Sequence, residues 1–286
     1  VKMALEIERK YLIDLEKIGT LENGIRIKQG YLSTDKNAVV RVRVKNDKAY
    51  LTIKGSILSS DHIMELFQLV SILNRLGIKT SDMKLIMPYC AYSRQDRVCN
   101  PGEALSMQVF AKMINSLGFG SIETHDNHSD VATALLDNCT NISVERIINF
   151  VDAKYDYLIS PDAGANKKVL KCSQKFQIPM LRADKVRDTR TGEIKETKIY
   201  ADKRQLKSNK TVLIIDDICA GGRTFKELTK AIKDISPECE VHLFITHGFF
   251  NNSVEVIDSL IESGISKIFT TTSVYNLEHK GVTCIK

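Results

Sequence analysis

Long apolar runs and paired cysteines are both missing from this sequence. No stretch approaches the roughly 20 apolar residues that cross a bilayer, and the first residues lack the apolar core of a secretion signal. The seven cysteines are odd in number and form no C-x-x-C pair, which argues against a disulfide scaffold or a structural zinc site. We therefore expect a cytoplasmic protein with reduced thiols and no membrane partner.

The sequence also has no internal repeat, no low-complexity tract and no aromatic-basic motif typical of nucleic-acid binding, so we expect no nucleic-acid partner. Its 286 residues are long enough for two domains, and 43% hydrophobic with 27% charged residues is an ordinary globular composition. The net charge of +6 is concentrated in residues 1–56, which hold twelve Lys or Arg against seven Asp or Glu. Such a basic region suits anionic small molecules, and the composition changes near residue 56.

A strand, an acidic pair and a glycine turn follow one another in residues 211–224. The β-branched run predicts a central parallel strand that ends at Asp216 and Asp217, and the helix after the two glycines is predicted to have Thr224 as its N-cap. Helix N-termini bind anions, and paired carboxylates bind ribose hydroxyls or magnesium. The stretch therefore predicts a sugar-phosphate site, with an ordinary acidic strand-turn-helix as the alternative.

This stretch resembles the phosphoribosyl-pyrophosphate loop of the phosphoribosyltransferase fold. Four positions match the usual pattern, namely Asp216, Asp217, Gly222 and Thr224. Three differ, because Ala220, Gly221 and Arg223 stand where an acidic residue, Thr and Gly are common. An arginine at that place can still neutralise phosphate. The resemblance implies that all seven residues contribute to binding ribose 5-phosphate.

The first fifty-six residues contain alternating segments that predict antiparallel strands, whose charged face would be solvated on an ordinary sheet. Their opening Glu-x-Glu-x-Lys signature resembles the CYTH family of triphosphate tunnel enzymes. The resemblance implies metal-binding carboxylates and phosphate-facing bases, respectively Glu6 and Glu8, and Lys10, Arg41, Arg43 and Lys54. The later strands of that family have no counterpart, so we expect a partial CYTH-like segment without triphosphatase activity.

A polar cluster follows a predicted helix, which starts after Ser59 with Asp61 as a cap, and a predicted strand at 85–89. Its two arginines suit a phosphate clamp, although charges on a surface loop are the plainer reading. Residues 88–97 resemble the P-Y-x-x-Y-x-R-Q-D-R motif of ribose-phosphate pyrophosphokinases. That resemblance implies contacts with ATP by Arg94, Gln95, Asp96 and Arg97.

Two further segments resemble the same family. Asp126 and His128 match its D-x-H segment, which implies binding of magnesium and ATP phosphates. His125 and His128 would also suit zinc by their spacing, but no third ligand supports that reading. Asp162 matches the S-P-D-x-G segment, which implies contacts with ribose 5-phosphate and with the metal.

The charged stretch after residue 182 contains a Thr-Gly turn and predicts a hairpin or flap. Charge runs of this kind are usually solvated. In the resembled family the matching lysine and arginine lie on a loop that closes over the reacting phosphates. The resemblance thus implies that Lys185 and Arg187 are catalytic.

We expect an α/β protein with a phosphoribosyltransferase-like parallel sheet, flanking helices and a small antiparallel β segment in front. The expected divisions are a CYTH-like segment at 1–56, an incomplete N-terminal phosphoribosyltransferase-like domain at 57–150, and a C-terminal one at 151–286. The pyrophosphokinase resemblance begins near Ser59, so that family's N-terminal portion, which often completes the adenine site of a neighbouring subunit, has no counterpart in this reading.

The resemblance implies an enzyme that transfers pyrophosphate from ATP to ribose 5-phosphate with Mg²⁺, assembled as a homo-oligomer. A catalytically weak nucleotide- or phosphoribosyl-binding protein or subunit stays open as an alternative. Two observations favour it: the family's N-terminal portion has no counterpart in this reading, and Ala220 stands where an acidic residue is common. A CYTH triphosphatase is the less favoured reading.

Overall fold

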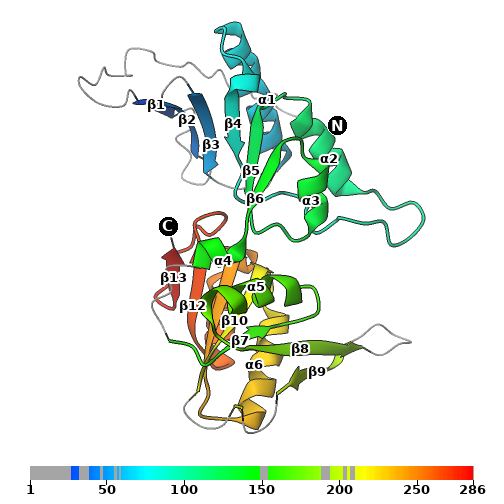
Figure 1. Cartoon of the computed structure of the whole chain (residues 1–286), viewed down its shortest axis with the longest axis vertical. Helices are drawn as coiled ribbons and strands as arrows, with labels where there is room; N and C mark the ends of the chain where they lie inside the picture. Colours follow the sequence, from blue (N-terminus) through cyan, green and yellow to red (C-terminus); the bar gives the residue numbers. More distant parts are fainter. Residues whose placement is uncertain are drawn as a thin grey trace, which may run out of the picture.

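The computed structural model has two α/β halves, one above the other in Figure 1. The chain passes between them from β6 (Cys139–Ile142) to α4 (Val144–Ile147). The structure describes residues 27–31, 39–45, 48–54, 57, 59–148, 154–187, 194–201, 205–206 and 210–285. None of the helices in these ranges is long and apolar enough to cross a membrane. The predicted α/β class, with parallel strands flanked by helices, is confirmed.

The first half is built on one six-stranded sheet whose strands follow the order of the sequence. Three antiparallel strands come first, namely β1 (Ile27–Tyr31), β2 (Val39–Lys45) and β3 (Lys48–Lys54). The sheet continues in parallel through β4 (Met83–Ile86), β5 (Ser121–His125) and β6. The antiparallel segment at the front of the fold is therefore present.

These antiparallel strands are not a separate unit, because β3 pairs directly with β4 and the composition change near residue 56 marks no break in the sheet. A mixed sheet shared with parallel strands gives no support to the tunnel-like reading of Arg41, Arg43 and Lys54, which lie on β2 and β3. The signature residues Glu6, Glu8 and Lys10 lie outside the described ranges.

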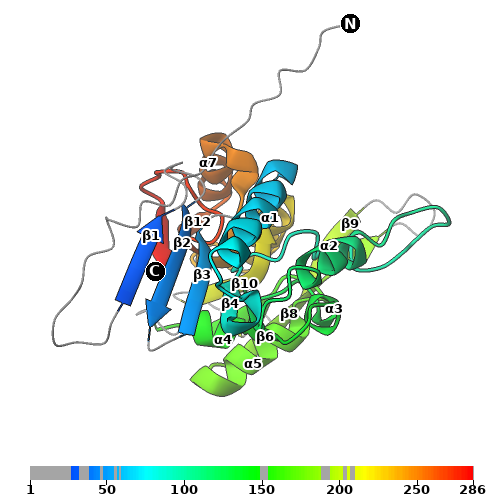
Figure 2. The ribbon, with the colours of Figure 1, turned by 90° about the horizontal axis from the view of Figure 1, so that it is seen from above.

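Helix α1 (Ser60–Arg75) packs an apolar stripe into the core of this half. Figure 2 shows the ribbon of this helix from above. The buried side chains of the stripe are Ile63, Leu66, Leu69, Val70 and Leu73. The N-cap is Ser59 rather than Asp61, because the Ser59 hydroxyl accepts a hydrogen bond from the amide of His62. The half is completed by α2 (Ser106–Asn115), α3 (Asp130–Leu135) and the 3₁₀ turn η2 (Thr80–Asp82).

The second half is a seven-stranded sheet in the order β13-β12-β11-β10-β7-β8-β9. Its strands are β7 (Tyr157–Ser160), β8 (Met180–Arg187), β9 (Ile194–Tyr200), β10 (Thr211–Cys219), β11 (Glu240–Gly248), β12 (Ile265–Thr271) and β13 (Val282–Ile285). All neighbours are parallel except β8 and β9, which form the predicted hairpin. Lys185 and Arg187 lie at the end of β8, and their side chains are outside the described part of the chain.

Strand β10 lies inside the sheet, and its side chains pack into a hydrophobic core on each face. This explains its continuous apolar sequence. Val212 and Ile214 pack with α6 (Arg223–Ile235) and α7 (Val254–Glu262). Leu213 and Ile215 pack on the other face, in a core that includes residues of α4 and α5 (Asn166–Phe176). Both faces are covered, so the prediction of a central strand is confirmed. The short 3₁₀ turn η4 (Phe250–Asn252) follows β11.

Helix α6 begins two residues earlier than the sequence predicted. Its N-cap is Gly222, with φ +72°, and Thr224 lies in the first turn instead of capping it. Only glycine adopts this left-handed conformation without steric cost. A Cβ at this position would also meet the side chain of Leu260 at 2.9 Å. The turn therefore requires glycine for both backbone and packing reasons.

We expect Gly222→Ala to lower the free energy of unfolding by about 2–4 kcal/mol, because a left-handed alanine and a clash in a packed core both destabilise the fold. Gly77→Ala is the matched control. Gly77 has φ +77°, but an added Cβ would meet nothing within 4 Å, so its loss is limited to the backbone cost of about 1–2 kcal/mol. Urea unfolding measures both variants. Equal losses would show that the Leu260 contact contributes nothing.

Candidate active site

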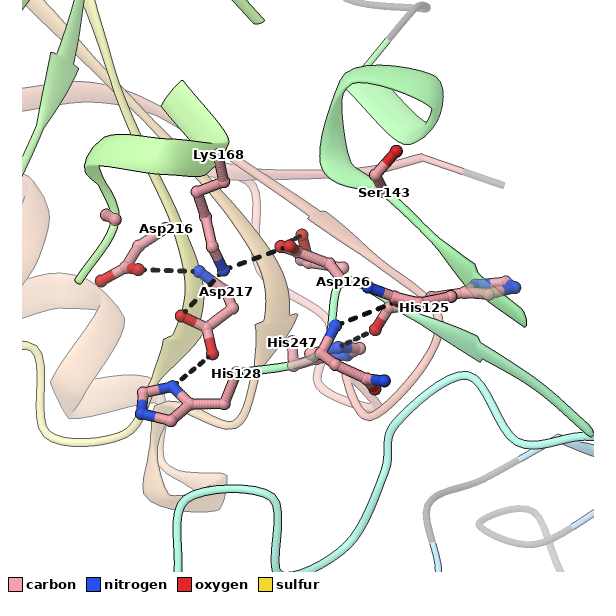
Figure 3. Close-up of polar contacts among 12 residues, drawn as sticks. His125, Asp126, His128, Ser143, Lys168, Asp216, Asp217 and His247 are labelled. Atoms are coloured by element: carbon pink, nitrogen blue, oxygen red, sulfur yellow. Dashed lines mark hydrogen bonds and ion pairs between the residues drawn. The ribbon is translucent and has the colours of Figure 1, made fainter. Parts of the chain in front are cut away.

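Side chains from both halves meet in one buried charged cluster (Figure 3). Lys168 of α5 places its Nζ 3.1 Å from Asp126 Oδ1 and 3.2 Å from Asp217 Oδ1. His128 donates from Nδ1 to Asp217 Oδ2 at 2.8 Å. Asp126 and His128 belong to the first half, whereas Asp217 and Lys168 belong to the second. The cluster therefore exists only where the two halves are docked.

The local fold explains why these groups converge. Asp126 directly follows β5, and Asp217 lies near the carboxyl end of β10. Parallel α/β sheets place ligands beyond the carboxyl ends of their strands, and here two such ends face each other. Thr246, near the end of β11, donates to Asp126 Oδ2 at 2.6 Å. The amide of Asp217 donates to Asp216 Oδ1 at 2.9 Å.

The cluster's charges hold one another ionised. Burial alone would raise the pKa of Asp217, but the hydrogen bond from His128 and the charge of Lys168 outweigh it and hold this pKa well below its usual range. Burial would likewise lower the pKa of Lys168, but Asp126 and Asp217 raise it above its ordinary value. Lys168 is thus a fixed positive charge inside the site.

Three further groups of the site have raised pKa values. Burial raises the pKa of Asp126, and burial together with the neighbouring Asp217 raises the pKa of Asp216 well above its ordinary value. The hydrogen bond to Asp217 raises the pKa of His128. Proton affinity is therefore high at Asp216 and His128, which flank the strongly acidic Asp217.

A cavity of about 270 Å³ lies over the loop after β10. Seven of the eight residues predicted to bind ribose 5-phosphate line it, namely Asp162, Asp216, Asp217, Ala220, Gly221, Gly222 and Thr224. Arg223 is not among the lining residues, and its Nε bonds to Glu227 Oε1 at 2.7 Å along α6. The suggestion that this arginine neutralises phosphate is therefore not supported by its place in the structure.

A second cavity of about 320 Å³ lies beside the first. The predicted ATP-binding residues are divided between the two, because Arg94 lines the first cavity whereas Asp96 and Arg97 line the second. Gln95 lines neither and has an exposed side chain. Among the described residues, three line both cavities: His128, Gly164 and Lys168.

The predicted metal ligands do not form a ready-made cage. Asp126 is engaged by Lys168 and Thr246, His128 by Asp217, and Asp162 Oδ1 accepts from the amide of Ala165 at 3.2 Å. Within the described ranges, no group of three or more His, Cys, Asp or Glu side chains is arranged to hold a metal ion.

Sequence reasoning missed Lys168, the residue at the centre of the cluster. Its signal was present, since two lysines open the helix that follows the Ser-Pro-Asp-Ala-Gly turn. Nothing in the sequence distinguishes the buried Lys168 from Lys167, which is exposed and pairs with Asp130. Thr246 and His247 were also missed, because they read as ordinary residues of a buried strand.

Two family models match the chain. The N-terminal domain of ribose phosphate pyrophosphokinase matches residues 24–118, and the phosphoribosyl transferase domain matches residues 130–271. The first match corrects the expectation that the resemblance begins near Ser59, since it includes β1 to β3. The N-terminal strands read as a CYTH-like segment thus fall within this family's own first domain.

Curated relatives agree with these models. The chain is 28% identical over 223 residues to the ribose-phosphate pyrophosphokinase of Sulfolobus acidocaldarius, covering 74% of this chain and 72% of the relative. It is 24% identical over 308 residues to the Mycoplasma genitalium protein of the same name, covering 99% and 88%.

A solved structure supports the fold. The crystal structure of phosphoribosylpyrophosphate synthetase from Mycobacterium smegmatis superposes with a TM-score of 0.70 at 18% identity, covering 90% of this chain and 85% of that one. Its fold extends over both halves of the molecule. The two domain models in their order along the sequence, with these relatives, show that the chain belongs to the ribose-phosphate pyrophosphokinase family.

Proposed function

We propose that the protein transfers the diphosphoryl group of ATP to the 1-hydroxyl of ribose 5-phosphate, giving AMP and phosphoribosyl pyrophosphate. The reaction joins the sugar oxygen to the β-phosphorus and breaks the bond between that phosphorus and the oxygen that leaves with AMP. The observation that carries the proposal is the pair of adjoining cavities with Lys168 and His128 in their common wall. The relatives named as ribose-phosphate pyrophosphokinases support the same reaction.

The cavity over the β10 loop suits the sugar phosphate. Gly221, Gly222 and Thr224 line it at the N-terminus of α6, where backbone amides and the helix dipole favour an anion. Asp216 and Asp217 at its other side suit ribose hydroxyls. Without a carboxylate at Ala220 and with Arg223 turned towards Glu227, the loop binds its ligand with these remaining groups.

The second cavity suits the nucleotide's phosphates. It is lined by four basic side chains, Arg97, Lys167, Lys168 and Lys171, and by four carboxylates, Asp96, Asp126, Asp130 and Glu145. The basic groups suit phosphate oxygens, and the carboxylates suit the magnesium ion that accompanies a triphosphate. Arg94 faces the sugar cavity from the neighbouring position in the same loop. A phosphate chain lying across the common wall would thus place its β-phosphorus near Lys168 and the sugar.

Magnesium would enter with the phosphates. Mg²⁺ at phosphate sites usually takes one or two protein carboxylates and completes its shell with phosphate oxygens and water. The family resemblance assigns it to Asp126, His128 and Asp162, one or two of which would bind it together with phosphate oxygens, because these side chains do not form a metal site by themselves in the described ranges. When bound, the ion neutralises charge on the transferred group. From the family resemblance we also propose a homo-oligomer in the cytoplasm.

The direct test measures AMP release from ATP and Mg²⁺ with and without ribose 5-phosphate. We expect AMP to form only when the sugar is present, because the acceptor hydroxyl comes from it. Release that does not depend on the sugar, or no release from folded protein, contradicts the proposal. In the second case, calorimetric titration with ribose 5-phosphate and with a non-hydrolysable ATP analogue decides whether the chain is a binding protein instead.

Lys168→Met should lower kcat by about 10²–10³, since a positive charge placed where charge develops typically contributes that much. The variant also leaves Asp126 and Asp217 buried without their cation, so its folding is checked by circular dichroism. Lys168→Arg keeps the charge and should retain more activity than Lys168→Met. Lys175→Met is the matched control on the same helix, because Lys175 lines neither cavity and its ammonium bonds the backbone carbonyl of Glu145. Equal activity in the Met variants of Lys168 and Lys175 would remove Lys168 from the mechanism.

Lys185→Ala and Arg187→Ala test the hairpin that β8 and β9 form. If these residues contact the phosphates chiefly in the transition state, each substitution lowers kcat by about 10²–10³ and changes the Kd for ribose 5-phosphate little. Steady-state kinetics and calorimetry separate the two effects. Should kcat stay within about twofold of the parent in both variants, the hairpin is a solvated surface and not part of catalysis.

A further inference from the structure

Asp126 has a backbone conformation that needs external support. Its φ is +40°, in the left-handed region that residues other than glycine seldom adopt. A backbone conformation of this kind lowers the stability of the fold by about 1–3 kcal/mol, and it persists only where surrounding contacts hold it. The amide of Asp126 donates to the carbonyl of Ile142 at 2.8 Å, which holds one side. That N–H belongs to the peptide bond between His125 and Asp126, and the other side of the same peptide is the carbonyl of His125.

His247 holds that second side from the other half of the molecule (Figure 3). Its Nε2 lies 2.9 Å from the carbonyl oxygen of His125, and its side chain is 2% exposed. Its ring packs edge-on against Tyr89 of the first half, with ring centroids 5.1 Å apart. The neighbouring residue on β11, Thr246, bonds the carboxylate of Asp126 itself. Two consecutive residues of one strand therefore fix the backbone and the side chain of this acid.

The hydrogen bonds define which nitrogen of His247 carries the proton. A carbonyl only accepts, so Nε2 must donate to His125. Burial lowers the pKa of His247 to about 4, and the neutral ring has a single N–H. Its Nδ1 then accepts from the hydroxyl of Ser273 at 2.7 Å. The hydroxyl of Thr271 donates in turn to the carbonyl of Thr246 at 2.7 Å. The His125 carbonyl thus defines the tautomer, and Ser273, which follows β12, satisfies the remaining nitrogen of the ring.

We propose that His247 is a positioning residue for the proposed reaction, whose Nε2–H holds the 125–126 peptide so that Asp126 and His128 face the acids and lysine of the opposite half. His247 itself is not among the residues that line either cavity. Ribose 5-phosphate binding, which the second half provides through the β10 loop, should not depend on it. Nucleotide-metal binding and turnover, which need both halves, should.

The inference rests on the proposed function only for its kinetic part. His247→Leu removes the donor, whereas His247→Gln places an amide N–H near the position of Nε2. His242→Leu is the matched control, because His242 lies on the same strand, is also 2% exposed, and bonds Tyr155 and Glu240 at the end of β11 away from the site. Thermal unfolding shows that each variant is folded at the assay temperature.

In His247→Leu we expect kcat to fall by about 10²-fold, as misplacement of reacting groups by about 1 Å does. Binding of Mn²⁺ with a non-hydrolysable ATP analogue should weaken, and the Kd for ribose 5-phosphate should stay unchanged. Hydrogen exchange should accelerate in the peptide covering residues 121–128, where Asp126 bonds Ile142. His247→Gln should restore most of the parent's values, and His242→Leu should show only lower stability.

Three results would overturn the inference: unchanged exchange at 121–128 in His247→Leu, no recovery in His247→Gln, or the same losses in His242→Leu. If the parent protein releases no AMP, the proposed function fails but the exchange and Mn²⁺ measurements still decide the role of His247.

Discussion

The active site depends on one interaction, the burial of the Lys168 ammonium between Asp126 and Asp217. Removing three charges from water costs several kcal/mol per ion unless close pairing compensates it. Each half supplies one of the two carboxylates, so neither half compensates the lysine fully by itself. Docking of the halves and assembly of the cluster are therefore the same event in energetic terms.

The two halves contribute different residues to the two cavities. The loop after β10 and the N-terminus of α6 belong to the second half, which supplies most of the lining of the cavity proposed for the sugar phosphate. The first half adds Asp126, His128 and the arginines that follow β4. If the two cavities hold the two substrates as proposed, the relative position of the halves affects transfer more strongly than it affects sugar binding.

The charged residues of the loop after β10 differ from the usual pattern of the phosphoribosyl-pyrophosphate loop. Ala220 supplies no carboxylate, and Arg223 lies along the outside of α6 beside Glu227. The carboxyl groups of the cavity are those of Asp162, Asp216 and Asp217, and its basic groups are those of Arg94, His128 and Lys168. In the proposed function, these basic groups and the N-terminus of α6 bind the anionic sugar phosphate even though the loop departs from its usual pattern.

The sequence by itself determined the α/β class, the central strand, the β8–β9 hairpin and the strand, acidic pair and glycine turn of residues 211–224. These follow from local signals, since apolar periodicity, glycine turns and acidic pairs act over a few residues. The N-cap of α6 at Gly222, which packs against Leu260, and the continuity of β3 with β4 depend on contacts between distant segments. So does the choice of Lys168 over Lys167, because their neighbourhood along the chain is the same and only the docking of two sheets buries one of them. The tertiary structure alone decided which charges face each other, because burial and pairing are properties of the assembled interface.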